Sequence, residues 1–233
     1  MKYAVIADIH SNLQALQAVL QDIKQQNCTH TVCLGDIVGY NTNPKECLDI
    51  IRGMNIPCVK GNHDEYCSEE KPLDGFNPKA AAAVEWTRQQ LSEEDRAWLR
   101  SLKHIETVAG FTIVHATLNH PERWGYVFNK LDAAASFPSQ NTAVCFFGHT
   151  HVPVAFIRDT TVRGGTYSKF QVERGKQYFV NVGSVGQPRD NNPKAAYATY
   201  DLKSSLIELR RIAYDLPGAQ GAIHATGLPR TPR

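Results

Sequence analysis

The sequence predicts an α/β protein in which two mixed β-sheets pack face to face with helices outside, a four-layer αββα sandwich. In the first part of the chain, short apolar runs alternate with segments of helical periodicity, and the last third turns to short strands separated by turns. No internal repeat or long linker interrupts the chain. We therefore expect one domain over residues 1–216, followed by a Gly-, Ala- and Pro-rich tail, residues 217–233, that is loosely attached.

Strands are expected where short runs are β-rich and mostly apolar. These runs are residues 2–7, 29–34, 56–59, 111–114, 144–147, 154–157, 178–182, 195–200 and 206–210. The pair Gly164-Gly165 predicts a turn between two of the later strands.

Helices are expected where a capping residue precedes apolar residues that recur at three- and four-residue steps. The expected starts are Ser11 or Asn12, Asn43-Pro44, Asn77-Pro78 and Ser92. In the two Asn-Pro pairs, Asn is the cap and Pro occupies the first turn, where its missing N–H costs nothing.

Composition excludes several classes of protein. The hydrophobic fraction of 42% and the charged fraction of 21% are ordinary for a folded chain. No stretch approaches the about 20 apolar residues that span a bilayer, and the first apolar run meets Asp8 too early for a signal peptide. The six cysteines form no CxxC pair, which favours reduced thiols in a cytoplasm. A net charge of +2 gives no attraction to nucleic acid.

Metal-binding types of side chain follow five of the expected strands. Since ligands of open α/β sheets bind outside the carboxyl ends of the strands, we expect these side chains at one edge of the fold. They are Asp8 and His10, Asp36, Asn62, His115, and His149 with His151.

The spacing and types of these residues predict a metal site. Residues two apart in an extended chain point the same way, so Asp8 with His10 and His149 with His151 can each offer two ligands. Glycines directly before the ligands permit tight turns. The mixture of carboxylate, imidazole and amide suits Mn, Fe or Zn. Seven ligands exceed the needs of one ion, and a carboxylate can bridge two ions about 3.5–4 Å apart; we expect Asp36 to be that bridge.

Each residue taken alone has a structural explanation. An aspartate after a strand is more often a helix cap or turn former, and a lone histidine at a strand end is more often a hydrogen-bonded core residue. The tripeptide His149-Thr150-His151 alone can be a surface turn. A site is favoured because all these residues stand together at strand ends.

Five short motifs resemble the blocks of the calcineurin-like metallophosphoesterases. They are Asp8-Ile9-His10, Gly35-Asp36, Gly61-Asn62-His63-Asp64, Val114-His115 and Gly148-His149-Thr150-His151. Their order and spacing are similar to a small bacterial and archaeal branch of that superfamily, with phosphodiesterase, phosphoprotein phosphatase and diadenosine tetraphosphatase-like members. The similarity includes residues 181–190 and reaches about Arg211.

The resemblance implies a hydrolase of phosphoric esters with two divalent transition metal ions, Mn first and Fe, Zn or Ni as alternatives. It implies these ligands: Asp8, His10 and His151 for the first ion, Asn62, His115 and His149 for the second, and Asp36 between them. It further implies that His63 faces the phosphate and donates to the leaving group, while Asp64 orients the His63 ring.

Four residues are candidate substrate contacts: Asn62, Tyr40, Arg123 and Arg189. Tyr40 can stack on a base or pack in the core. Arg123 belongs to a segment, residues 123–126, that can cover the pocket, although a packed aromatic turn is the favoured interpretation. Arg189 can reach a phosphate or form a structural ion pair.

The predicted reaction is hydrolysis of a phosphate mono- or diester by a hydroxide that bridges the two ions. The substrate is a small molecule, a nucleotide among them, or a phosphoprotein; the sequence does not predict an oligomeric state. One alternative is a non-catalytic scaffold on the same fold, as in a retromer subunit, but such proteins show incomplete ligand sets. Another is a nuclease, although the chain shows no basic cluster interleaved with aromatic residues.

Overall fold

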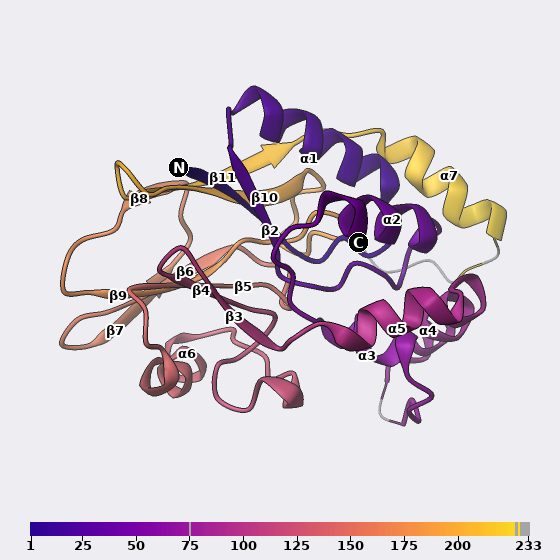
Figure 1. Ribbon diagram of the computed structural model, residues 1–233, viewed down its shortest axis with the longest axis horizontal. Helices are drawn as coiled ribbons and strands as arrows, with labels where there is room; N and C mark the ends of the chain where they lie inside the picture. Colours follow the sequence, from indigo (N-terminus) through magenta and orange to yellow (C-terminus); the bar gives the residue numbers. More distant parts are fainter. Residues whose placement is uncertain (75, 227, 229–233) are drawn as a thin grey trace.

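The computed structural model describes residues 1–74, 76–226 and 228, and within these it contains two mixed β-sheets (Figure 1). The first sheet has the strand order β2-β1-β10-β11-β8 and the second the order β3-β4-β5-β9-β6-β7. The strands of the first sheet are β1 (Lys2–Ile6), β2 (His30–Cys33), β8 (Lys169–Gln171), β10 (Ala195–Asp201) and β11 (Leu206–Ile212). Those of the second are β3 (Ile105–Val108), β4 (Phe111–Val114), β5 (Val144–Phe147), β6 (Val154–Arg158), β7 (Val162–Gly165) and β9 (Gln177–Asn181).

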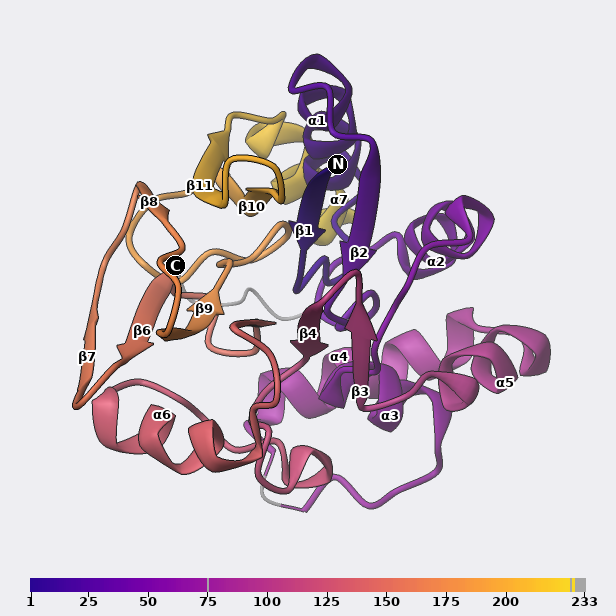
Figure 2. The ribbon, with the colours of Figure 1, turned by 60° about the vertical axis from the view of Figure 1, so that its left-hand side comes forward.

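Helices cover the outer faces of both sheets. α1 (Leu13–Gln25) packs on β10 and β11 of the first sheet, and α7 (Leu216–Thr226) packs on α1. The apolar cluster under α1 extends to α2 (Pro44–Met54), α3 (Asn62–Ser68), α4 (Pro78–Gln90) and α5 (Glu93–Ser101). On the side of the second sheet lies α6 (Lys130–Ser136), beneath the strands in Figure 2. Two 3₁₀ turns, η1 (Pro121–Arg123) and η2 (Phe137–Ser139), flank α6.

Alternation along the strands assigns side chains to separate apolar layers. In β1, Ala4 and Ile6 join a cluster with α1 and α2, whereas Tyr3 and Val5 join a second cluster that includes residues of β4, β5 and β9. A third cluster packs α6 and η2 against the far face of the second sheet, where Phe147 and Phe179 stack. Three apolar layers between four structural layers confirm the predicted αββα sandwich.

The expected helix starts are confirmed, and at three of the four a side chain caps the helix. The Asn12 side chain accepts a hydrogen bond from the N–H of Ala15 and so caps α1. Asn77 caps α4 in the same way, and Ser92 caps α5. Asn43 precedes Pro44 at the start of α2, but its side chain makes no capping bond.

Two local expectations differ from the structure. Residues 56–59 form no strand and pair only through isolated bridges, Cys33 with Cys58 and Val59 with Lys103. Gly164 and Gly165 belong to β7 and form no turn. Gly164 is needed there because a β-carbon would lie 2.3 Å from the Phe156 ring, which packs over it from the neighbouring strand.

The tail that the sequence separates from the domain is partly helical. Residues 217–226 belong to α7, which contacts α1 and buries Ala219. The domain boundary at residue 216 and the loose attachment of the tail stay predictions, and residues 227 and 229–233 lie outside the described residues. Within the described part of the chain, every helix is too short or too polar to cross a membrane.

Candidate metal centre

The metal-binding side chains lie where loops from the two sheets meet. β1 and β2 are parallel neighbours in the first sheet, and β4 and β5 are parallel neighbours in the second, so the carboxyl ends within each pair point the same way. The N–H of His149, beyond β5, donates to the Asp8 carboxylate beyond β1 at 3.0 Å. The expectation of one sheet edge is therefore corrected: two sheets contribute, and the loops after them are joined by hydrogen bonds.

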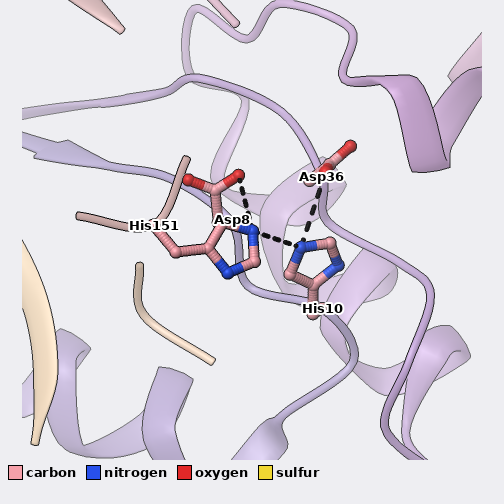
Figure 3. Close-up of side chains that lie close together, drawn as sticks. All are labelled: Asp8, His10, Asp36 and His151. Carbon is pink, nitrogen blue, oxygen red and sulfur yellow. Dashed lines mark hydrogen bonds and ion pairs between the residues drawn. The ribbon is translucent and has the colours of Figure 1, made fainter. Parts of the chain in front are cut away.

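All seven predicted ligands come together in one buried cage. One ligand atom from each of Asp8, His10, Asp36 and His151 lies within 4.8 Å of the others. Figure 3 shows these four side chains. Asp36, His115 and His149 form a second group on the same criterion. Asn62 joins the second group, because its Oδ1 lies 3.2 Å from His115 Nε2. Asp36 alone belongs to both groups.

Backbone carbonyl groups orient the four histidine rings. His10 Nδ1 lies 3.1 Å from Val38 O, and His151 Nδ1 lies 2.6 Å from Gln187 O. A carbonyl only accepts, so Nδ1 carries the proton and Nε2 presents its lone pair to the cage.

The rings of the second group are fixed by the same kind of bond. His115 Nδ1 donates to Leu34 O at 2.8 Å, which directs its Nε2 to the cage. In His149 the roles of the nitrogens are exchanged, because Nε2 donates to Trp124 O at 3.0 Å and leaves Nδ1 free for a cation.

The contact between His10 and His151 tests whether a cation fits. Their Nε2 atoms are 3.0 Å apart. Burial holds the pKa of both rings well below the ordinary value, so both are neutral. With both Nδ1 atoms protonated, two lone pairs face each other at that distance. This arrangement is repulsive unless a cation accepts both, and the residues therefore fit a divalent metal ion.

The carboxylates and His115 are strongly coupled. Burial raises the pKa of Asp8 to about 7, although His115 opposes the rise. Burial acts on Asp36 as well, but His115, His63 and His10 outweigh it and hold the Asp36 pKa well below its ordinary value. Burial lowers the pKa of His115, and Asp36 with Asp8 outweighs this and raises it to about 9. Cation binding would displace these protons, since ligands bind deprotonated.

Five of the seven ligands have left-handed backbone conformations. The φ angles are 53° for Asp8, 48° for His10, 52° for Asp36, 68° for His149 and 61° for His151. Each such conformation costs about 1–3 kcal/mol in a non-glycine residue, and such costs cluster at functional sites. The expectation that Asp8 with His10 and His149 with His151 converge through extended chain is thus wrong: tight turns aim them into the cage.

Glycines allow the loops to approach the carboxylates. A β-carbon on Gly61 would lie 2.1 Å from Asp36 Oδ1, and one on Gly148 would lie 2.6 Å from Asp8 Oδ2. Gly35 has a φ of +89° and faces the backbone of Gly61. The close approach that the sequence predicts for these glycines is therefore present.

His63 lies beside the cage without belonging to it. Its ring centroid is 4.9 Å from that of His10 and 4.5 Å from that of Tyr40, and only 4% of the residue is exposed. Burial lowers the His63 pKa to about 4. Among the described residues its Nδ1 has no hydrogen-bond partner.

Asp64 binds the backbone of the ligand loops, which differs from the role that the resemblance implies. Its carboxylate accepts hydrogen bonds from the N–H groups of Asp36 at 2.8 Å, Ile37 at 2.9 Å, Val38 at 3.3 Å and Gly61 at 3.1 Å. Both oxygens are used to join the two ligand loops, so the expected role of orienting the His63 ring is corrected. Packing against His10 and Tyr40 orients that ring instead.

The candidate substrate contacts separate into two groups. Arg189 donates to the Tyr40 hydroxyl at 3.5 Å, and its guanidinium lies 5.8 Å from the centre of the Tyr40 ring, which in turn packs on His10. Arg123 is exposed, pairs loosely with Glu122, and lines a surface cavity of about 300 Å³. Tyr40 and Arg189 are therefore near the cage, whereas Arg123 belongs to an adjoining cavity.

Several supporting residues have little or no sequence signal. The carbonyl groups that orient the histidines come from residues of any type. The Ser184 hydroxyl donates to Asp8 O, and the Asn181 amide donates to Gly148 O, and both lie in the segment 181–190 that resembles the family. Tyr126, beyond Trp124, stacks on His149 at 4.2 Å between centroids.

Comparisons with known proteins identify the family of this chain. Residues 1–205 match the calcineurin-like phosphoesterase superfamily domain. A metallophosphoesterase structure from Sphaerobacter thermophilus is similar with a TM-score of 0.85 and 37% identity, covering 99% of this chain and 95% of that one. An uncharacterized protein of Methanocaldococcus jannaschii is 40% identical over 231 residues, 97% of this chain and 93% of that protein.

A more distant relative carries a named activity. The phosphodiesterase YfcE of Escherichia coli K12 is 26% identical over 202 residues, 86% of this chain and 88% of YfcE. The matched residues 1–205 contain every motif of the cage, from Asp8 to His151. This chain belongs to the calcineurin-like phosphoesterase superfamily and is a metal-dependent phosphoesterase.

Proposed function

We propose that the protein hydrolyses phosphate mono- or diesters with a pair of divalent transition metal ions. The observation that carries this proposal is the double cluster of ligands around Asp36, in which the lone pairs of His10 and His151 face each other at 3.0 Å. One ion would be held by Asp8, His10 and His151 and the other by Asn62, His115 and His149, with Asp36 shared. When bound, such ions activate water and neutralise charge on phosphoryl oxygens.

Manganese is the first choice of metal, with Fe, Zn or Ni as alternatives. The ligands are imidazole, carboxylate and amide groups, which suit these ions better than Ca²⁺ or Mg²⁺ alone. In each of the four histidine rings, the nitrogen that faces away from the cage donates a hydrogen bond to a backbone carbonyl group. This outer support fixes the geometry of the ligands.

His63 is the proposed donor to the leaving-group oxygen. With a pKa of about 4 the ring is neutral near pH 7 and carries one N–H, so it can donate a hydrogen bond to the leaving-group oxygen as the ester bond breaks. Its ring packs against the cage ligand His10. Asp64 contributes indirectly, because it fixes the backbone of Asp36.

Arg189 and Tyr40 are proposed to bind phosphoryl oxygens at the mouth of the cage. Burial lowers the pKa of His63 most, Asp36 raises it, and the positive charge of Arg189 lowers it. The electric field of Arg189 therefore reaches the site. A guanidinium can hold a phosphate by two parallel hydrogen bonds.

Small phosphate esters or a phosphoprotein are the proposed substrates. All six cysteines, which lie within the described residues, are free thiols, and we propose a cytoplasmic location on that ground.

A turnover screen tests this function. The protein is stripped of metal, reloaded separately with Mn²⁺, Fe²⁺, Zn²⁺ or Ni²⁺, and assayed on p-nitrophenyl phosphate, its bis-ester, a dinucleoside polyphosphate, a phosphopeptide and single-stranded DNA. Turnover that needs metal and disappears in Asp36→Asn is the expected result. Absence of turnover on every substrate by fully loaded protein would contradict the proposal and favour a scaffold. Selective cleavage of DNA would favour a nuclease.

A further inference from the structure

Two aromatic side chains are exposed next to the metal centre. Tyr126 is 53% exposed and Phe128 is 64% exposed, in the loop that connects β4 to α6. Exposed large aromatic side chains that gather at one place mark binding surfaces more often than exposed single residues do. Figure 2 shows that this loop and α6 lie along one side of the second sheet.

These side chains form a stack that starts at a proposed metal ligand. The Tyr126 ring lies 4.2 Å from the His149 ring at an angle of 26°, and the Phe128 ring lies 5.3 Å from the Tyr126 ring at an angle of 5°. Three nearly parallel rings thus lead from the buried cage to the surface. Phe128, the outermost, has the largest exposure.

Hydrogen bonds fix the backbone at both ends of the stack. Asp132 accepts hydrogen bonds from the N–H groups of Phe128 at 2.9 Å and Asn129 at 3.2 Å, and the Asn129 side chain caps α6 in return. At the other end, Trp124 O accepts from His149 Nε2. A ring held in place before binding loses little conformational entropy when a second ring stacks on it.

A cavity adjoins the stack on the Tyr126 side. Its volume is about 300 Å³, and its lining includes polar groups of Asn119, His120, Arg123 and Asp132. These side chains offer both hydrogen-bond donors and acceptors. A sugar carries hydroxyl groups that need such partners, and a planar base needs an aromatic face.

We propose that Tyr126 and Phe128 form a binding subsite for the base of a nucleoside phosphate ester whose phosphate lies at the Asp36 cage. The inference rests on the proposed phosphoesterase function. The Phe128 ring lies two stacking steps, 4.2 Å and 5.3 Å between centroids, from the ring of the proposed ligand His149. Stacking on aromatic side chains binds bases of any kind, so the subsite selects nucleoside esters over esters without a base.

A protein partner fits this surface less well. Leu131 is the one other large apolar residue that the described part of the chain exposes in this segment. A stable protein interface takes about 20–30 residues on each side, most of which this patch lacks. The continuity of the stack with His149 favours a ligand of the metal centre.

The test compares two esters with the same alkoxide leaving group. Adenosine 5′-monophosphate carries a base, and methyl β-D-ribofuranoside 5-phosphate carries a methyl group in its place. The Mn-loaded wild type is expected to show a higher kcat/KM on the nucleotide, and Phe128→Ala is expected to lower the ratio of the two kcat/KM values about tenfold. Phe128→Trp keeps an aromatic face and is expected to keep the ratio.

Leu131→Ala is the matched control, because it removes an exposed apolar side chain of the same segment outside the stack. It is expected to leave both kcat/KM values as in the wild type. Metal content and thermal midpoint of Phe128→Ala show whether the variant is intact. An equal ratio in wild type and Phe128→Ala, with both esters hydrolysed, would overturn the subsite while the proposed function stands.

A binding measurement keeps the two proposals separate. Calorimetric titration with the phosphonate analogue of the nucleotide and with that of the methyl riboside needs no turnover. If neither ester is hydrolysed, base-dependent binding that Phe128→Ala weakens about tenfold still supports the subsite. Equal binding of both analogues overturns it, as does a change of oligomeric state in Phe128→Ala with no change in the ratio.

Discussion

At the scale of single residues, hydrogen bonds to the backbone decide what each polar side chain does. His63 and Asp64 are adjacent, yet one lies with a free ring nitrogen beside the cage and the other accepts four N–H groups from the ligand loops. The first is available for chemistry and the second is committed to structure. Substitution of these two residues should therefore have different consequences.

The pair His63→Gln and Asp64→Asn tests this difference. In His63→Gln, kcat should fall by about 10²–10⁴ while metal content stays near that of the wild type, since no proposed ligand is moved. In Asp64→Asn, an NH₂ group replaces one acceptor oxygen and faces backbone N–H donors that it cannot bind. Metal content and thermal midpoint should therefore both fall. Elemental analysis and calorimetry of both variants check this, and loss of metal in His63→Gln would contradict the assignment.

Gly61→Ala and Gly53→Ala test the close approach of backbone to carboxylate. A β-carbon at Gly61 would meet Asp36 Oδ1 at 2.1 Å, so Gly61→Ala should displace the shared carboxylate and reduce both metal content and turnover by more than tenfold. At Gly53, within α2, no atom of the described residues beyond its chain neighbours and its own helix backbone lies within 4 Å of such a carbon. Gly53→Ala should stabilise the protein by about 0.5–1 kcal/mol and keep its metal. Equal metal content in the two variants would refute the steric argument.

At the scale of helices and strands, the structure depends on polar ties as well as on apolar layers. Asp22 of α1 accepts hydrogen bonds from the Tyr197 hydroxyl on β10 at 2.6 Å and from Arg210 on β11 at 3.1 Å and 3.2 Å. This tie joins a helix to two strands far away in sequence. Burial raises the pKa of Asp22, but Arg210 and Tyr197 outweigh it and hold the pKa below 3.8.

Asp22→Asn should therefore destabilise the protein in a pH-dependent way. Because the folded-state pKa is depressed, the contribution of the carboxylate is complete above the unfolded pKa near 3.8 and is lost as pH falls through the folded pKa. The free energy of unfolding should differ by about 1.5–3 kcal/mol between wild type and variant at pH 7, and by less near pH 3. Urea unfolding at both pH values measures this; a difference independent of pH would be evidence against the tie. The control is Asp49→Asn, which removes an exposed ion pair with Lys45. It should lower the free energy of unfolding by under about 1 kcal/mol at either pH.

The sequence predicts most helices and strands, but it does not predict the strand at Gly164-Gly165 or the helix α3. Apolar periodicity and the caps Asn12 and Ser92 locate α1 and α5 because both signals are local. The pair Gly164-Gly165 misleads because the need for glycine comes from the Phe156 ring on the next strand, a contact that local sequence does not contain. α3 is missed since its seven residues are mostly the polar motif that forms the cage.

At the scale of the whole molecule, the fold brings titratable ligands into its interior. Asp8, Asp36, His10, His115 and His151 are each at most 1% exposed. The residue types and their places after strands predict this cage from the sequence. The left-handed turns at the ligands and the carbonyl groups that orient the rings are not predictable, because both depend on the loops of two sheets and on backbone atoms that any residue supplies.

Removal of metal should destabilise the entire domain. Ions that bind only the folded state stabilise it by about 2.7 kcal/mol at a concentration one hundred times Kd. Stripping with a chelator should therefore lower the thermal midpoint by several degrees, and Mn²⁺ should restore it. Scanning calorimetry of stripped and reloaded protein provides the check, with Asp36→Asn as a control that should no longer respond to Mn²⁺. A midpoint that is the same with and without metal would speak against ions in the interior.

The most direct test of the dinuclear cage is anomalous X-ray diffraction from crystals of the Mn-loaded protein. Two anomalous peaks are expected, about 3.5–4 Å apart, one on each side of the Asp36 carboxylate. One of them should lie near Asp8, His10 and His151 and the other near Asn62, His115 and His149. A single peak, no peak, or peaks remote from Asp36 would contradict the account.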